Sequence, residues 1–386
     1  MITFTDQNTL TLLENGHDFF PALLGALHQA QTDIYLESYL FVLDSTGSQV
    51  AHALLAAAQR GVVVHVVLDG FGARDFPKRW QQAWQQAGIH CLFYRPELTP
   101  WRLRRHRLRR LHRKLCVVDQ RIAFIGGINI IDDWNTPGQT PPRYDYAVAI
   151  HGPLVHDIVL TMRDLWQRAV LLQQRRWAWE WPPMRPSLPS GQQRAALVVR
   201  DNLRYRRAIE HSYLEAITQA HTEIFIANAY FFPGRSLRQA LLAAARRGVR
   251  VRIMVQGRVE YFLLHHACRR LYPLLLAAGI ELIEYRRSFM HAKVAVIDHH
   301  WATVGSSNID PFSLLLAREA NLLVEDDRFA HQLERSLQRA IKRGGQRITA
   351  KNWQQRHWWQ HVLSYLCYFA VRFLIGMTGY GRQEYS

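Results

Sequence analysis

Residues 112–129 read HRKLCVVDQRIAFIGGIN, and residues 291–308 read HAKVAVIDHHWATVGSSN. Both stretches place His, Lys, Asp, Gly and Asn at relative positions 0, +2, +7, +14 and +17. Hydrophobic periodicity constrains only apolar positions, so it does not explain five shared polar or glycine positions at fixed spacing. We interpret the phrase as a duplicated functional motif. Two copies with one histidine each predict an active site where two half-sites meet.

The repetition extends well beyond the two motifs. Residues 32–36 are echoed at 222–226, residues 53–61 at 240–248, and residues 87–89 at 278–280. The offset between the copies changes along the chain (222 − 32 = 190, but 291 − 112 = 179), which indicates loop insertions between shared elements. The chain therefore consists of two related halves.

Each half reads as alternating strands and helices. In the first half we expect strands at 34–40 and 62–68, and a helix between them that ends at Gly61. The second half repeats this scheme, with a strand at 249–255. The first motif predicts two strands joined by a turn, at 114–119 and 123–125. Strands that alternate with helices indicate parallel pairing covered by helices, so the predicted fold class is α/β.

The composition suggests four regions. We expect a first half at 1–165 with the first motif, a Trp/Pro-rich linker at 166–196, a second half at 197–345 with the second motif, and an aromatic tail at 346–386. Proline at high density breaks regular structure and marks the linker. For its tryptophans, Trp177, Trp179 and Trp181, packing on the domain surface is preferred over contact with lipid.

The tail at 346–386 is rich in Trp, Tyr and Phe. A membrane-spanning helix needs about 20 uninterrupted apolar residues, and Arg372 interrupts this stretch. Aromatic residues with Arg and His nearby suit a helix that lies in the membrane interface. The alternative is a C-terminal helix docked on the protein.

The charge balance points to anionic partners. Lys and Arg number 48 against 31 Asp and Glu, a net charge of +17, which suits either phosphate-bearing polymers or an anionic membrane surface. The 12 Trp residues favour the membrane. The cysteines are scattered without metal-ligand spacing, so we expect free thiols in a reducing compartment: Cys91, Cys116, Cys268 and Cys367. The first residues, MITFTDQN, lack the features of a secretory signal, and we expect the protein on the cytoplasmic side.

The motif residues are suited to phosphoryl chemistry. A histidine attacks phosphorus as a neutral imidazole or donates a proton as an imidazolium, so His112 and His291 can divide these two tasks. Residues two apart on a strand point to the same face, which brings Lys114 and Lys293 to the same ligand as fixed positive charges. No step requires a metal, because the cations are side chains.

The other polar motif positions have more than one interpretation. Asn129 and Asn308 are expected to donate hydrogen bonds to a phosphate at the end of the next strand. Asp119 and Asp298 are candidate catalytic residues, but they follow an apolar run at a strand end where a turn is expected. A structural role, hydrogen bonding to local backbone, is at least as consistent with that position.

The duplicated pattern HxKxxxxD, followed by glycines and Asn, resembles the signature of the phospholipase D superfamily. The resemblance covers roughly residues 5–345. Within the superfamily the chain is most similar to bacterial cardiolipin synthases, particularly the short B type, through the phrases at 36–39, 121–127, 226–234 and 301–308. The resemblance implies two phospholipase D-like halves, each a mixed sheet flanked by helices, with the active site at their interface.

The resemblance also implies a mechanism without a cofactor. One of His112 and His291 would form a phosphatidyl-histidine, and the other would act as acid and base. An acidic residue some way after each motif would orient that motif's histidine, which assigns Asp145 to the first and Glu319 to the second.

The implied reaction converts two phosphatidylglycerols into cardiolipin and glycerol at a membrane surface, with the protein bound peripherally on the cytoplasmic side. Hydrolysis to phosphatidic acid would use the same residues. A nuclease would suit the net charge of +17, but the tail and the similarity to synthases argue against a nucleic-acid partner. Two intact motifs argue against a catalytically idle membrane-binding protein.

A basic insertion precedes the first motif. Between Trp101 and Lys114, a stretch that contains this insertion and the start of the motif, the chain carries no acid and seven arginines: Arg102, Arg104, Arg105, Arg107, Arg109, Arg110 and Arg113. The insertion is expected to be a loop at the mouth of the site that attracts anionic headgroups. The alternative is a solvated run of charge.

Overall fold

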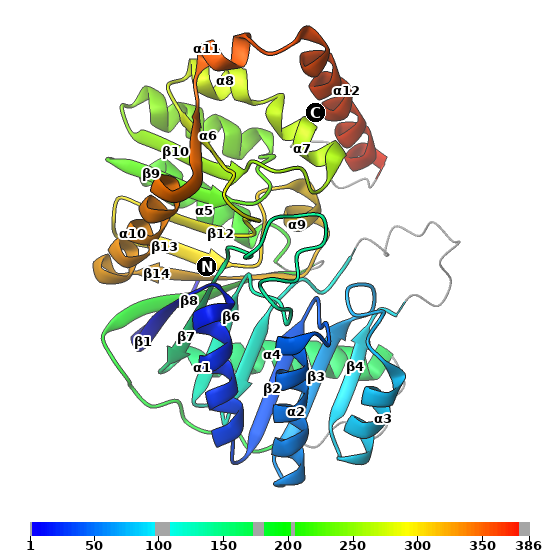
Figure 1. Ribbon diagram of the computed structural model, residues 1–386. Coiled ribbons are helices and arrows are strands. Elements are labelled where there is room, and N and C mark those ends of the chain that lie inside the picture. The colour runs from blue at the N-terminus through cyan, green and yellow to red at the C-terminus, as the bar shows by residue number, and fades with distance from the viewer. Residues whose placement is uncertain (1, 97–108, 173–180, 202–204, 378–386) are drawn as a thin grey trace.

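The structure is a computed structural model that describes residues 2–96, 109–172, 181–201 and 205–377. Most of the basic insertion, from Arg102 to Arg107, lies outside the described residues. So do two of the three linker tryptophans, Trp177 and Trp179. In Figure 1 the first half, in blue to green, lies below the second half, in green to red.

The two halves contain the following elements. The first half comprises β1 (Thr5–Glu14), α1 (Asn15–Gln29), β2 (Asp33–Ser38), α2 (Ser45–Gln59), β3 (Val63–Asp69), α3 (Lys78–Gln86), β4 (His90–Tyr94), β5 (Leu115–Val118), β6 (Ile122–Gly126), β7 (Tyr146–His151) and α4 (Leu154–Leu172). The second half comprises β8 (Gln193–Arg200), α5 (Ala208–Gln219), β9 (Glu223–Asn228), α6 (Arg235–Arg246), β10 (Arg250–Gln256), α7 (Phe262–Arg269), α8 (Tyr272–Ala277), β11 (Glu281–Tyr285), β12 (Lys293–Ile297), β13 (Trp301–Gly305), α9 (Pro311–Leu315), β14 (Glu319–Glu325) and α10 (Asp327–Gly344). After α10 come β15 (Gly345–Ile348), α11 (Ala350–Gln354) and α12 (Trp358–Met377).

The described strands form one 15-stranded sheet in the order β15-β11-β10-β9-β12-β13-β14-β8-β1-β7-β6-β5-β2-β3-β4. The order is nearly mirrored about the β8–β1 pair, which joins the halves in antiparallel fashion. In each half three strands pair in parallel, β2-β3-β4 and β9-β10-β11, and the motif strands pair antiparallel beside them. The expected α/β fold of two similar halves with mixed sheets is confirmed.

The motif strands are buried on both faces. In β5, Leu115 and Val117 join an apolar cluster that runs across both halves, whereas Cys116 and Val118 join the cluster under α1 and α2. This alternation follows from the two-residue period of a strand. The central cluster also contains residues of α4 and α10, so the two halves share one apolar core. A shared core holds the two motifs in a fixed relation.

In each half, a glycine ends the helix that precedes the second of the three parallel strands. Gly61 after α2 has φ +92°, and Gly248 after α6 has φ +90°, a backbone region that favours glycine. The helix end and the strand that follows it were both predicted from sequence, and the structure confirms them.

Three boundaries differ from those expected. The linker was expected to begin at residue 166, but α4 continues to Leu172 because its apolar face packs on the sheet. The second half begins earlier than residue 197, since β8 starts at Gln193 and pairs with β14 and β1. It also ends later than residue 345, because β15 pairs with β11 as far as Ile348.

The linker tryptophan that the structure describes packs against the first half. The indole of Trp181 stacks on the buried ring of His65, with centroids 4.5 Å apart, and contacts Tyr35 and Trp166. Packing was the preferred interpretation for the linker tryptophans, and for Trp181 it is confirmed.

The tail forms a helix that docks on the second half. One face of α12, which lies beside α7 in Figure 1, buries Cys367, Val371 and Ile375 in the apolar cluster that contains residues of α7. The opposite face of α12 is exposed. Within the described part of the chain, no helix combines the length and the hydrophobicity needed to cross a bilayer. Docking was one of the two interpretations of the tail, and the exposed face leaves room for the other.

Candidate active site

The histidine of the first motif, His112, lies just before β5. Its backbone is held by the second half, because His112 N donates to Arg318 O at 2.9 Å and Leu111 pairs in parallel with Arg318. Its Nδ1 lies 3.0 and 3.1 Å from the two carboxylate oxygens of Glu319, which is fully buried at the start of β14. When Nδ1 donates to a carboxylate, the second nitrogen, Nε2, is free to act on a substrate.

The second histidine, His291, makes the corresponding contacts with residues of the first half. His291 N donates to Tyr144 O at 2.8 Å, so the segment before β12 runs beside the segment before β7. The Nδ1 of His291 lies 2.6 Å from Oδ2 of the buried carboxylate of Asp145. Each histidine therefore depends on a carboxylate from the other half.

This reciprocal pairing corrects the sequence-based assignment. Asp145 was expected to orient His112, and Glu319 to orient His291, because each acid follows the corresponding motif. In the structure the acids are exchanged: Asp145 contacts His291 and Glu319 contacts His112. The reason is that β7 and β14 both lie toward the β1–β8 junction, so the start of each faces the opposite half. Both histidine–carboxylate pairs lie at the interface of the halves, where the site was expected.

Both motif lysines lie beside their histidines. The Nζ of Lys114 donates to the carbonyl oxygen of His112 at 2.7 Å, and that of Lys293 donates to the carbonyl oxygen of His291. Lys293 is also 4.0 Å from Asp145. Both lysine side chains are buried, so their ammonium groups are poorly solvated and available to a bound anion.

Burial shifts the ionisation of the whole site. It lowers the pKa of Lys114 to about 7, against the opposing effect of Glu319, and it also lowers the pKa of Lys293. Burial lowers the pKa of His112, and that of His291 falls well below its ordinary range through burial and the charge of Lys293. Both imidazoles are therefore biased toward the neutral form, which is the form that attacks phosphorus.

The structure places the motif aspartates away from the histidines. Asp119 is at the far end of β5 from His112, where its carboxylate accepts from the backbone N–H groups of Gln31, Thr32 and Asp33. Asp298 makes the same contacts with residues 221–223. These bonds tie each motif hairpin to the start of the neighbouring strand. The contacts support the structural interpretation of both aspartates and give no support to a direct catalytic role.

The motif asparagines are buried at the end of the following strand. Oδ1 of Asn129 accepts from Leu40 N at 3.2 Å, an orientation that leaves its amide NH₂ as a donor. Oδ1 of Asn308 has no hydrogen-bond partner among the described residues. Neither arrangement conflicts with the expected role in binding phosphate, which stays a prediction.

Three further residues belong to the site but were not singled out from the sequence. The ring of Tyr39 lies 4.9 Å from that of His112 and 5.4 Å from Lys114 Nζ. Arg143 is buried two residues before Asp145, and Ser306 donates its hydroxyl to Glu319 Oε2 at 2.5 Å. In the sequence, Tyr39 stood out only as part of the stretch at 36–39, which resembles cardiolipin synthases. Ser306 lies within the second motif, but its counterpart in the first is Gly127, so the repeat gave no reason to choose it.

Comparison with known proteins agrees with this geometry. Residues 23–159 and 213–341 match the family described as "Cardiolipin synthase, PLD-like domain". The chain belongs to this family. Each matched segment contains one of the two motifs, so the family match coincides with the internal repeat.

Individual relatives extend the family match over nearly the whole chain. The chain is 38% identical over 379 residues to cardiolipin synthase B of Escherichia coli (strain K12), which covers 98% of this chain and 91% of that protein. It is 40% identical over 376 residues to cardiolipin synthase B of Salmonella typhi, covering 97% and 90%. Among solved structures, a phosphatidylserine synthase of Haemophilus influenzae Rd KW20 superposes with a TM-score of 0.73 at 15% identity, covering 97% of this chain and 96% of that one. The family member is thus a phosphatidyltransferase of the phospholipase D superfamily.

Proposed function

We propose that this cardiolipin synthase family member transfers a phosphatidyl group from one phosphatidylglycerol to another, giving cardiolipin and glycerol. The observation that carries the proposal is the reciprocal site, in which two histidines, each bonded to a carboxylate of the opposite half, lie within electrostatic reach of two buried lysines. Such a site can hold one phosphodiester between two imidazoles. The identity of the lipid comes from the relatives named cardiolipin synthase.

The first step forms a phosphatidyl-histidine. Nε2 of one neutral imidazole attacks the phosphorus of the donor lipid, and the bond from phosphorus to the glycerol oxygen breaks. The second histidine gives its proton to the departing glycerol oxygen, and the imidazolium form that this step needs is stabilised, against the effect of burial, by the carboxylate bonded to its Nδ1. Lys114 and Lys293 stabilise the charge on the non-bridging oxygens, aided by the amides of Asn129 and Asn308.

The second step reverses the first with a new alcohol. A hydroxyl of the second phosphatidylglycerol gives its proton to the now neutral second histidine and attacks phosphorus, and the bond from phosphorus to Nε2 of the first histidine breaks. Cardiolipin leaves, and both histidines return to their starting forms. The carboxylates of Asp145 and Glu319 fix the tautomers and support whichever imidazole carries the positive charge.

The proposed membrane contact rests on α12. Its exposed face presents large apolar side chains, among them Trp358, Leu366 and Phe373, at 76%, 63% and 69% exposure. Arg372 on the same helix lies over the ring of Tyr368. An apolar face with basic residues suits the headgroup region of an anionic bilayer. We therefore propose that the protein binds the membrane peripherally. We propose the cytoplasmic side because its cysteines are free thiols, as in a reducing compartment.

One experiment separates transfer from its rivals. Purified protein is incubated with phosphatidylglycerol whose headgroup glycerol carries ¹³C, in water enriched in ¹⁸O, and the products are resolved by mass. Transfer predicts cardiolipin and free ¹³C-glycerol, with no ¹⁸O in cardiolipin. Phosphatidic acid that carries ¹⁸O, without cardiolipin, would show that water is the acceptor. Cleavage of DNA without lipid turnover would replace the proposal with a nuclease.

A further inference from the structure

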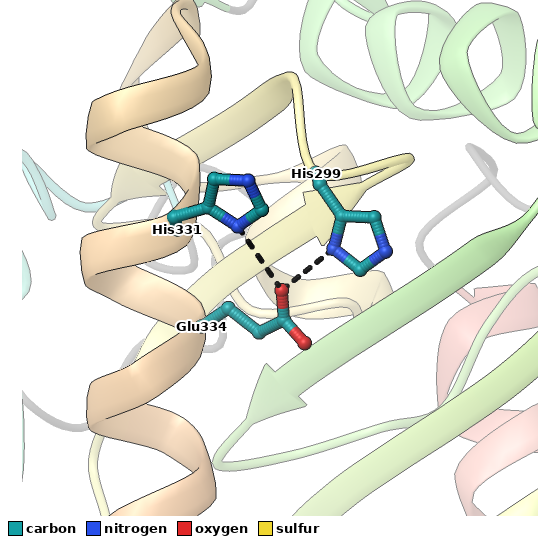
Figure 2. A group of neighbouring side chains, drawn as sticks. All are labelled: His299, His331 and Glu334. Carbon is teal, nitrogen blue, oxygen red and sulfur yellow. Dashed lines mark hydrogen bonds and ion pairs between the residues drawn. The ribbon is translucent and has the colours of Figure 1, made fainter.

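A second cluster of ligating side chains lies on the outside of the second half, where the β12–β13 turn meets α10 (Figure 2). His299 comes from the turn, and His331 and Glu334 come from α10. One ligand atom from each side chain lies within 4.8 Å of the other two. Positions three apart on a helix share a face, so His331 and Glu334 are neighbours. Figure 2 shows both imidazoles directed toward the same carboxylate oxygen.

The two oxygens of Glu334 have different partners. Oε1 accepts from Nη2 of Arg252 at 3.2 Å and from Nε2 of Gln338 at 2.8 Å. Oε2 faces the histidines, 2.7 Å from Nδ1 of His299 and 4.0 Å from Nδ1 of His331. One oxygen is therefore held in place by neighbouring side chains, while the other is directed to the two imidazoles. Carboxylate ligands of metals commonly accept hydrogen bonds from residues that do not touch the metal, and Oε1 of Glu334 has such bonds.

We propose that His299, His331 and Glu334 bind one zinc-type divalent ion, a function separate from the reaction proposed above. Two imidazoles and one carboxylate form a ligand set that zinc uses elsewhere, with water in the fourth position. A metal bound to Nδ1 of His299 takes the place of the proton that this nitrogen shares with Glu334. The charge of Arg252 does not exclude a cation, because its Nε lies 2.6 Å from a second carboxylate, that of Glu223.

The position of the cluster indicates a structural rather than a catalytic metal. The five residues of β12 lie between the cluster and His291, a length of about 16 Å at about 3.3 Å per residue. A bound ion would fasten the motif hairpin to α10, whose own contacts reach the first half: Ser336 and Arg339 bond to Glu14. The first half has no equivalent ligand, since Gln120 occupies the position of His299 and bonds to Pro183 O and Arg185 N of the linker.

A neighbouring histidine provides a matched control. His300 follows His299 on the same turn and has its own carboxylate, with Nδ1 2.6 Å from Oδ1 of Asp327. Both of these side chains are exposed, and the structure shows no third ligand near them among the described residues. If zinc merely binds any exposed His–carboxylate pair on this histidine-rich chain, loss of His300 should matter as much as loss of His331.

The test uses the full chain without a polyhistidine tag, stripped with chelator and titrated with ZnCl₂ by calorimetry, and with Co²⁺ by visible absorption. We expect one tight equivalent per chain. His299→Ala and His331→Ala should each weaken affinity by at least about 10-fold, since loss of even an outer-shell partner commonly costs that much. His300→Ala should change affinity less than about twofold. At one fixed zinc concentration, zinc should raise the unfolding temperature of the wild type and of His300→Ala more than that of the other two variants.

Two further measurements keep the result clear. Circular dichroism of the metal-free variants checks that they fold, and His331→Gln serves as a second variant if His331→Ala does not. Lipid turnover without zinc should be unchanged, because none of these residues lies in the catalytic site. Equal zinc affinity in wild type and in the double variant His299→Ala/His331→Ala would overturn the proposal. So would the absence of a tight equivalent, which would leave the cluster as a hydrogen-bonded contact.

Discussion

The two halves contain the same His–Lys pair of the motif but support it with different side chains. In the first half Arg113, between His112 and Lys114, forms a buried bidentate ion pair with Glu37 of β2, at 2.8 and 2.9 Å. In the second half the residue at the motif position of Arg113 is Ala292. Ala227 pairs with β12 where Glu37 pairs with β5. The buried ion pair of the first half is thus replaced by two alanine side chains in the second half.

The orienting carboxylates differ as well. Asp145 fits against Gly127, where an added Cβ would lie only 2.4 Å from its Oδ1. The equivalent of Gly127 in the second motif is Ser306, which instead donates to the longer Glu319. Burial raises the pKa of Asp145 to about 6, so the partner of His291 lies in poorly solvating surroundings. The repeat preserves the reacting groups, while the different supports make the two histidines electrostatically unequal, as a division into nucleophile and acid requires.

Removal of either histidine should have the largest effect. We expect His112→Ala and His291→Ala each to reduce cardiolipin formation by at least about 10³-fold, because a missing acid–base or nucleophile cannot be replaced from the other half-site. A phosphatidyl ester of p-nitrophenol distinguishes the two roles, since its leaving group needs no proton. The variant that lacks only the acid should still release a burst of nitrophenol, measured by absorbance.

His300→Ala, on the surface of the second half, is the control for that comparison. A burst in both histidine variants, or substantial cardiolipin formation in either, would contradict the shared site.

Amide replacements test the exchange of carboxylates between halves. Asp145→Asn and Glu319→Gln should slow turnover by about 10²- to 10⁴-fold, by analogy with loss of the orienting aspartate in a serine protease triad. Because the acids are exchanged, Asp145→Asn should reproduce the burst behaviour of His291→Ala, and Glu319→Gln that of His112→Ala. The measurement is the same nitrophenol assay with each variant.

The opposite correspondence, in which Asp145→Asn behaves like His112→Ala, would restore the order in which the acids follow the motifs in sequence. Thermal unfolding of both amide variants serves as the control for folding.

The smallest effect concerns α12, which belongs to the second half alone. Leu366→Gln combined with Phe373→Gln should weaken binding to phosphatidylglycerol vesicles by about 10- to 30-fold, because burial of a large apolar side chain contributes about 1.5–3 kcal/mol and insertion here is partial. Sedimentation with vesicles measures the change. Leu188→Gln in the linker, also exposed at 74%, is the matched control. Turnover in detergent should be unaffected, and equal sedimentation of all three proteins would remove α12 from the membrane contact.

Much of the fold was accessible from local sequence. The apolar runs predicted β3 and β10 to within about one residue, and Gly61 and Gly248 marked the helix ends because their positive φ favours glycine. The extent of α4 was not accessible, since the chain continues in a helix to Leu172 only because that face packs on the sheet. The sequence also did not specify what the tail contacts, because that too depends on packing. Its sequence suited both membrane and protein contact, and packing against α7 buried one face of α12 and left the other exposed.

The sequence by itself determined which residues are the candidate reacting groups, because His112, Lys114, His291 and Lys293 recur at a spacing that no core pattern requires. It also predicted that the candidate site needs both halves. Only the tertiary structure decided which acid serves which histidine, since that depends on β7 and β14 meeting the opposite half across the β1–β8 junction. It likewise brought His299 to His331, 32 positions away, where spacing in the chain carries no signal. Contacts between distant strands and helices arise from packing, and packing is a property of the folded chain rather than of any local stretch.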